Sequence, residues 1–288
     1  MSLVVQKFGG TSLADAEKIH RAARRAICAK LDGHHVVLVV SAMGGTTDQL
    51  IALAQGVCPD PPKRELDMLL TTGEQVSIAL MAMAIHAAGH RAISLTAAQL
   101  GLFTDSAHTR ARIQTISRDR IDRELSSGNI VIVAGFQGVD ESGEITTLGR
   151  GASDTTAAAL AAVLEGKVCE IYTDVDGVYT TDPRVVPKAR KIDAISYDVM
   201  LEMAATGAGV MHSRAIEFGK KFNVPIHVRS ALTDAKGTMI MAETPGMEAV
   251  AVRGVTLKED LAMISLNGVP NTTGMAARIF AEVARRNL

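Results

Sequence analysis

Six short runs of mostly β-branched and apolar residues, separated by segments long enough for helices, constrain this fold more than any other feature of the sequence. The runs cover residues 3–8, 35–42, 91–97, 129–136, 169–175 and 224–230. Near-continuous apolar strands that alternate with helices are typical of parallel sheets buried on both faces. The sequence therefore predicts an α/β fold, a three-layer αβα sandwich with a mostly parallel central sheet.

The segments between the runs have helical periodicity. One apolar stripe recurs with a period near 3.6 and consists of Ile19, Ala22, Ala23, Ala26, Ile27 and Leu31. Residues 76–84 are apolar on more sides and predict a more fully buried helix. SDTTAAALAAVLEG (153–166) predicts a helix that begins at Ser153 or Asp154 and ends at Gly166.

Composition argues against several classes of function. The 288 residues carry 30 Lys and Arg against 31 Asp and Glu, a net charge of −1, so no nucleic-acid partner is expected. MSLVVQKF lacks a signal-peptide core, and no apolar run approaches the roughly 20 residues of a membrane helix. The three cysteines are scattered and the histidines show no ligand spacing, so we expect buried free thiols and no metal ligands from the protein. A cytoplasmic protein is expected.

Four glycine- or hydroxyl-rich clusters directly follow predicted strands: GGTS, SAMGGTT, GFQG and TDVDG. Ligands of open α/β sheets bind at the carboxyl ends of the strands. This placement favours a functional interpretation of each cluster.

KFGGTS has two interpretations. Lys7 ends a strand, Gly9 and Gly10 can adopt positive φ and approach a ligand closely, and the following helix N-terminus favours anions. Lysine adds a positive charge that can follow a phosphate oxygen during transfer. The same residues also fit a plain strand–turn–helix connection, and from this stretch alone both interpretations stay open.

GRGASD predicts an anion site before a helix. Arg150 offers a planar fork for a carboxylate, and Gly151 permits close approach. Ser153 and Asp154 occupy the helix start, where they are also expected to cap it. Asp154 would then orient Lys7 rather than bind substrate.

EIYTDVDGVYTTDPR fits either a turn at Asp182-Pro183 or a nucleotide site. In a nucleotide site, Thr173 and Asp174 lie at a strand end, Tyr179 lies against the base or ribose, and Arg184 lies on the phosphates. Glu74 in TTGEQVS is likewise open to two interpretations. By default, a glutamate in the first turn of a helix interacts favourably with the helix dipole. Glu74 could instead bind a substrate ammonium.

The pattern changes near residues 242–254. From there the sequence predicts a strand, a turn, a second strand, a glycine loop and a helix that ends with the chain. These are the opening elements of a small α+β domain without the strands that would bury its helix. We expect a main domain over 1–245 and an incomplete domain over 249–288, in a fragment or in a chain whose partner supplies the missing strands.

Five motifs occur in order: KFGGTS, TTGEQVS, GRGASDTTA, YTDVDGVYTTDPR and GVMHSRAIEF. With them, residues 1 to about 240 resemble the aspartate kinase family of the amino-acid kinase superfamily. The residues from 249 on resemble the start of the family's ACT-type regulatory region. The resemblance implies the amino-acid kinase fold and ATP-dependent phosphorylation of the β-carboxylate of L-aspartate to 4-phospho-L-aspartate, with Mg²⁺ bridging the phosphates. This is the first step toward lysine, threonine and methionine, and family members with a complete regulatory region are usually homo-oligomers.

The resemblance also implies roles for single residues. Lys7 stabilises the transferred phosphoryl group, with Gly9 and Gly10 as backbone donors, and Asp154 organises the groups around it. The implied aspartate ligands are Arg150, Ser153 and Thr47 for the α-carboxylate and Glu74 for the ammonium. The implied residues of the ATP pocket are Thr173, Asp174, Tyr179, Arg184, Gly209 and Val210.

Two positions depart from the family pattern. GRGASD has Ala152 where the family usually has a third glycine, which would cost about 1 kcal/mol if the position needs positive φ. GAGV has Gly209 where the family often has a lysine near the nucleotide, so we expect at most a backbone contact from Gly209 or Val210.

Two other functions remain open. The chain could be a superfamily member that phosphorylates glutamate, N-acetylglutamate, carbamate or UMP, although Arg150 with Glu74 favours a free amino acid. It could also be a catalytically weak amino-acid-sensing protein, although Lys7, Arg150 and Asp154 are all present.

Overall fold

The computed structural model describes residues 2–243, 253–257, 265–270 and 272–285. The chain divides into two compact units, Met1–Leu257 and Lys258–Leu288. The predicted boundary between 245 and 249 lies outside the described residues, so the assignment of two domains remains a proposal.

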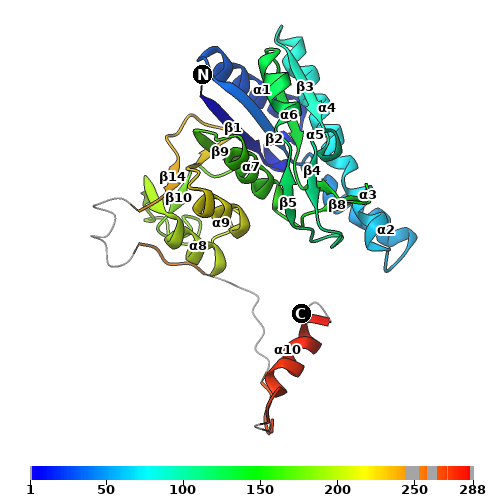
Figure 1. The fold of residues 1–288 in the computed structure, drawn as a ribbon. Coiled ribbons are helices and arrows are strands. Elements are labelled where there is room, and N and C mark those ends of the chain that lie inside the picture. The colour runs from blue at the N-terminus through cyan, green and yellow to red at the C-terminus, as the bar shows by residue number, and fades with distance from the viewer. Residues whose placement is uncertain (1, 244–252, 258–264, 271, 286–288) are drawn as a thin grey trace. The chain divides into compact units, whose positions relative to one another are not determined.

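The first unit is built on an eight-stranded sheet (Figure 1). In spatial order its strands are β12 (Ala194–Ser196), β14 (Thr238–Met241), β13 (Ile226–Ser230), β9 (Val168–Thr173), β1 (Leu3–Phe8), β2 (His35–Val40), β6 (Ile130–Ala134) and β3 (Ala92–Leu95). All neighbours pair in parallel except β13 with β14. The six predicted runs are six of these strands, which confirms the mostly parallel sheet.

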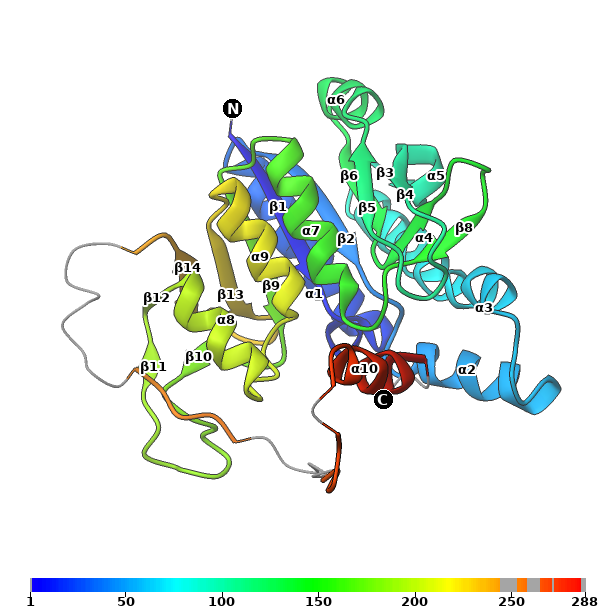
Figure 2. The ribbon, with the colours of Figure 1, turned by 60° about the horizontal axis from the view of Figure 1, so that its bottom comes forward.

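Helices cover both faces of the sheet and complete the three predicted layers. On one face, α1 (Ala16–Leu31) and α4 (Thr72–Ala87) bury one apolar cluster against β1, β2 and β6. On the other, α7 (Ala152–Val163), α8 (Tyr197–Ala205) and α9 (Ser213–Phe222) bury a second cluster. Figure 2 shows α7 and α9 side by side over this face.

Shorter elements complete the unit. The helices are η1 (Gly10–Leu13), α2 (Thr46–Val57), α3 (Lys63–Leu70), α5 (Ala97–Leu100) and α6 (Asp119–Ser126). A second sheet has the order β5 (Ile113–Ile116), β4 (Leu102–Thr104), β7 (Gln137–Val139) and β8 (Ile145–Thr147). A two-stranded sheet joins β10 (Val178–Tyr179) to β11 (Lys191–Ile192). These strands have two to four residues, which is too few for a periodic sequence pattern to predict them.

The apolar surfaces of two helices differ from the predicted ones. Leu31, at the end of the α1 stripe, is exposed, and so are Val76 and Met83 on α4. α4 is therefore apolar on more sides than the sheet buries. Lys63–Ala87, spanning α3 and α4, is long and apolar enough by length and composition to cross a membrane, but half of its most apolar window is buried in the fold.

Among the described residues of the second unit, α10 (Met275–Arg285) is the predicted C-terminal helix, and none of its described residues is buried. The two expected strands before it fall mostly outside the described residues. The described parts, 253–257 and 265–270, contain no strand.

Helix α7 explains the alanine that departs from the family pattern. Gly149 and Gly151 have positive φ, 92° and 72°, whereas Ala152 does not and forms the first residue of the helix. Ala152 is also fully buried in a cluster with Phe136 and Leu148. The anticipated strain is therefore absent.

Ala152→Gly should lower the free energy of unfolding by about 1 kcal/mol, because glycine loses more backbone entropy in a helix and removes a buried methyl group. Urea denaturation of both proteins measures this difference. A more stable glycine variant would show that the backbone at this position is strained.

Candidate active site

The four glycine- or hydroxyl-rich clusters meet at one edge of the sheet. Phe8 of β1 is level with Val40 of β2 and Tyr172 of β9, and Val40 is level with Ala134 of β6. The loops that follow these strands therefore leave the sheet together at its carboxyl edge, where open α/β sheets bind ligands.

An ion pair between Lys7 and Asp154 lies at the centre of this edge. Lys7 Nζ is 2.6 Å from Asp154 Oδ1, and the two side chains are only 12% and 8% exposed. Asp154 belongs to the first turn of α7, and its Oδ2 accepts a hydrogen bond from the His212 backbone N–H at 3.2 Å. The pair thus joins β1, α7 and the start of α9. The contact places the carboxylate where it could orient the lysine, a role that stays a prediction.

Gly9 and Gly10 do not adopt the backbone conformation that the sequence suggested. Neither has positive φ, and the Gly9 N–H donates to the Tyr172 carbonyl at 3.3 Å. A Cβ on Gly10 would lie 2.6 Å from the Ala42 carbonyl oxygen, and one on Gly9 would lie 3.5 Å from Lys7 Nζ. Gly10 is needed because the loops pass too close together for a side chain there, whereas a Cβ on Gly9 would make only ordinary contacts. The Gly9 N–H is engaged within the fold.

Glu74 is buried at the same edge. It is 3% exposed, its Oε1 accepts from the Ala42 N–H at 3.0 Å, and its Oε2 is buried without a hydrogen-bond partner among the described residues. Desolvation raises the pKa of Glu74 to about 7. A buried acceptor with one free oxygen suits a cationic ligand.

Arg150 and Thr47 lie on the more exposed side of the site. Arg150 Nη2 is 2.6 Å from Asp48 Oδ1, and the arginine side chain is 78% exposed. Thr47 is half-buried beside Asp48 in the first turn of α2. Ser153, by contrast, is buried so close to the β6 end that a Cβ on Gly135 would lie 2.6 Å from its Oγ.

The predicted nucleotide residues are dispersed along one segment. Thr173 Oγ1 donates to Asp174 Oδ1 at 3.0 Å, and the Tyr179 hydroxyl donates to Asp176 at 2.9 Å. Arg184 is exposed and pairs with Asp182 at 2.7 Å. No described contact joins these side chains to the Lys7–Asp154 pair.

Gly209 and Val210 lie in the loop between α8 and α9. Gly209 is exposed, and a Cβ there would meet no atom within 4 Å, so the position has room for the side chain that the family often carries. Val210 is half-buried and packs against the core beneath α9.

Sequence reasoning missed Asp67, a fully buried carboxylate. It accepts hydrogen bonds from the Thr109 N–H at 3.0 Å and the Thr147 hydroxyl at 2.6 Å, and it pairs with His108 at 2.9 Å. Thr147 ends β8, three residues before Arg150. The only signal was an acidic residue between the apolar residues Leu66 and Met68.

It also missed Arg214, in the GVMHSRAIEF motif. Arg214 Nη1 donates to the Leu148 carbonyl at 2.7 Å, and Nη2 donates to the Ala111 carbonyl at 3.3 Å. Asp67 and Arg214 therefore hold the segment that carries Arg150 from two different helices.

Glu74→Gln should stabilise the protein more at pH 8 than at pH 5. The folded-state pKa is raised, so the folded protein keeps a proton that the unfolded chain loses above pH 4.5, and stability falls as pH rises to about 7. A rise from 4.5 to about 7 corresponds to at most about 3 kcal/mol at high pH. Urea denaturation at the two pH values tests this, and an equal effect at both would contradict a raised pKa.

Comparison with known proteins agrees with this geometry. Residues 2–230 match the model of the amino acid kinase family. The aspartokinase of Bacillus sp. (strain MGA3) is 51% identical over 288 residues, which cover 100% of this chain and 70% of the relative.

Two solved structures are also similar. A Synechocystis aspartate kinase is 48% identical, with a TM-score of 0.75, over 84% of this chain and 40% of that one. E. coli aspartokinase III, in complex with aspartate and ADP, is 27% identical, with a TM-score of 0.83, over 99% of this chain and 74% of that one. The present chain thus spans less than half of the Synechocystis protein. Sequence and fold together place it in the amino acid kinase family, among the aspartokinases.

Proposed function

We propose that this chain transfers the γ-phosphoryl group of Mg–ATP to the β-carboxylate of L-aspartate and so forms 4-phospho-L-aspartate. The observation that carries the proposal is the nearly buried Lys7–Asp154 pair at the carboxyl edge of the sheet. The complex of E. coli aspartokinase III with aspartate and ADP supports the choice of substrates.

A carboxylate needs no general base to attack phosphorus, so the protein must mainly position the reactants and neutralise charge. One oxygen of the aspartate β-carboxylate attacks the γ-phosphorus as the bond to the β–γ bridging oxygen breaks, and ADP leaves. Lys7 neutralises charge on the transferred group. Asp154 holds the lysine in place through the transfer.

Glu74 and Arg150 recognise the two α-groups of the substrate. The free Oε2 of Glu74 accepts a hydrogen bond from the substrate ammonium. The positive charge of the ammonium would lower the raised pKa of this carboxyl. Arg150 leaves Asp48 and pairs with the α-carboxylate of the substrate. Its ion pair with Asp48 is exposed and contributes little stability, so Arg150 leaves it readily. Thr47 and Ser153 complete this end of the site.

Mg²⁺ enters with ATP as part of the substrate. In the described part of the chain, no group of three or more His, Cys, Asp or Glu side chains could hold a metal ion. The phosphates therefore supply most of the ligands. Thr173, Asp174, Tyr179, Arg184, Gly209 and Val210 are proposed to line the ATP pocket, with Gly10 near the phosphates.

The wider assignments are also proposals. Residues 1–245 form the catalytic domain, and 249–288 begin an ACT-like regulatory domain. The protein acts in the cytoplasm in amino-acid biosynthesis, and it forms a homo-oligomer when the regulatory region is complete. Glu74 and Arg150 together fit a free amino acid, which disfavours N-acetylglutamate, carbamate and UMP, and the KFGGTS motif favours aspartate over glutamate.

Hydroxylamine trapping tests the activity. Aspartate with ATP and Mg²⁺ should give aspartyl hydroxamate, because hydroxylamine attacks the acyl phosphate, whereas glutamate should give no hydroxamate. UMP forms no acyl phosphate, so its use is followed by ADP release, which should stay at background. Soluble, folded protein that forms no hydroxamate would support the amino-acid-sensing alternative.

Lys7→Ala is the matched variant for this assay. It should lower kcat by about 100-fold or more and leave the KM for aspartate nearly unchanged, because the lysine stabilises charge in the transition state. A near-normal kcat would remove Lys7 from the chemistry.

Arg214→Met should raise the KM for aspartate several-fold by releasing the Leu148 carbonyl and loosening the segment that carries Arg150. Arg150→Ala alone should raise this KM by about tenfold or more. In the Arg150→Ala background, Arg214→Met should add little, because its effect passes through the lost arginine. Steady-state kinetics of the four proteins complete the cycle, and additive effects would show that Arg214 acts elsewhere.

A further inference from the structure

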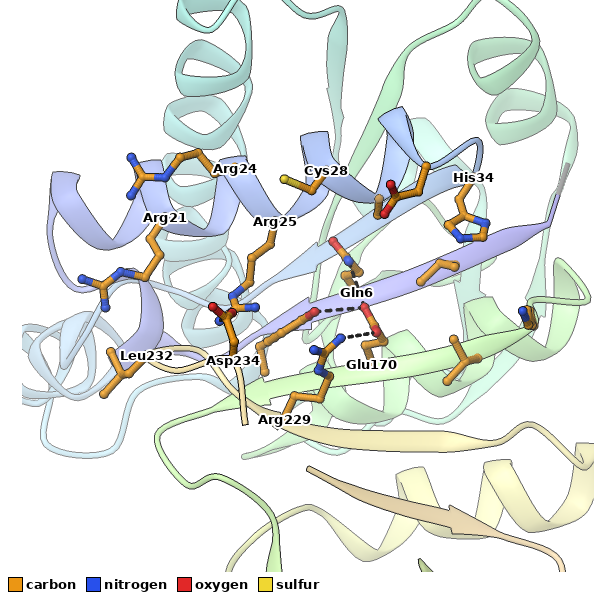
Figure 3. Close-up of a pocket in the computed structure, with 16 residues that line it drawn as sticks. Gln6, Arg21, Arg24, Arg25, Cys28, His34, Glu170, Arg229, Leu232 and Asp234 are labelled. Carbon is orange, nitrogen blue, oxygen red and sulfur yellow. Dashed lines mark hydrogen bonds and ion pairs between the residues drawn. The ribbon is translucent and has the colours of Figure 1, made fainter. Parts of the chain in front are cut away.

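A groove of about 620 Å³ lies on the reverse face of the strands that carry Lys7 and Thr173. Side chains alternate along a strand, so Lys7 faces α7 while its neighbour Gln6 faces the α1 side. Gln6 of β1, Glu170 of β9 and Arg229 of β13 form the floor, and α1 forms a wall (Figure 3). The volume is within the usual range for small-molecule sites.

The floor is a buried polar network in which one hydrogen-bond acceptor has no partner among the described residues. Glu170 accepts hydrogen bonds from Gln6 Nε2 at 2.9 Å and the Tyr172 hydroxyl at 3.1 Å, and it pairs with Arg229 Nη1 at 3.0 Å. The amide nitrogen of Gln6 must face this carboxylate, which fixes its orientation. Gln6 is 98% buried, and its Oε1 has no hydrogen-bond partner among the described residues. This oxygen can accept a hydrogen bond from a water molecule or from the hydroxyl group of a ligand.

The wall supplies positive charge. Arg25 pairs with Asp234 at 3.2 Å, but its Nε is buried without a partner among the described residues. Arg24 on the same helix and Lys167 at the start of β9 also line the groove, and neither side chain has an ion pair in the described part of the chain. Glu170 and Asp234 are already paired with arginines, whereas Asp32, the third carboxylate that lines the groove, has no ion pair in the described part of the chain. Arg24 and Lys167 together outweigh Asp32, so a small excess of positive charge remains, which favours an anion.

We propose that this groove is a second ligand site, separate from the catalytic edge, for a small organic anion that carries its own hydroxyl group. The anionic group faces Arg24, Lys167 and Arg25 Nε, and the hydroxyl donates to Gln6 Oε1. Hydroxycarboxylates and hydroxylated phosphate monoesters share this chemistry. The site does not depend on the proposed catalytic function.

Cys28 lines the groove and is exposed, contrary to the expectation that the cysteines are buried, so it reports on occupancy. In a Cys58→Ser background, Cys28 is the accessible thiol, because Cys169 is buried. Citrate should slow its alkylation by iodoacetamide saturably, and tricarballylate, which is citrate without the hydroxyl, should protect less at equal ionic strength. Glycerol 3-phosphate and propyl phosphate form the second matched pair, and the hydroxylated probe that protects identifies the class of anion.

Variants test the same contacts. Arg24→Gln and Lys167→Gln should each weaken protection by about threefold, as expected for exposed ion pairs. Lys30→Gln removes a positive charge from α1 outside the groove and should change nothing. The proposal is overturned if neither hydroxylated probe protects Cys28, if the members of each pair protect equally, or if Lys30→Gln weakens protection as much as Arg24→Gln.

Discussion

The ion pair between Lys7 and Asp154 is the interaction on which the rest of the active site depends. Neither charge is tolerated alone in so buried a place, because removing one partner leaves an uncompensated charge. The pair fixes the end of β1 to the first turn of α7, and the second oxygen of Asp154 holds the backbone at His212 before α9. Three segments far apart in the sequence are thereby held at one point.

Close backbone approach makes that arrangement possible. A Cβ on Gly10 would lie 2.6 Å from the Ala42 carbonyl, and one on Gly73 would lie 2.8 Å from the Ala42 side chain. Gly73 directly precedes Glu74, whose carboxylate accepts from the Ala42 amide. The absence of side chains at these glycines lets α4 and the β1 loop meet the end of β2. The buried carboxylate and the lysine can then share one edge of the sheet.

Much of the fold could be predicted because the buried parallel strands have a strong apolar signal. The prediction placed Lys7 at a strand end and Asp154 at a helix start beside it, whereas Glu74 was brought to the same site only by the family resemblance. The suggestion that Gly9 and Gly10 adopt positive φ was wrong. A glycine pair is equally typical of a turn that needs positive φ and of a place without room for a side chain, and only the packing shows which applies.

Other features leave little trace in a single sequence. The pairing of Arg150 with Asp48, and the hydrogen bonds from Arg214 to Leu148 and Ala111, join residues 66 to 103 positions apart. Gln6 and Glu170 are 164 residues apart and belong to apolar strands, so no local motif marks the groove that they line.

A crystal structure of the protein with aspartate and a non-hydrolysable ATP analogue tests the central claim most directly. The account predicts that Lys7 Nζ contacts the γ-phosphate while still paired with Asp154, that Arg150 has left Asp48 for the α-carboxylate of aspartate, and that Glu74 accepts the ammonium. Phosphates bound away from Lys7, or aspartate bound without Arg150 and Glu74, would contradict it.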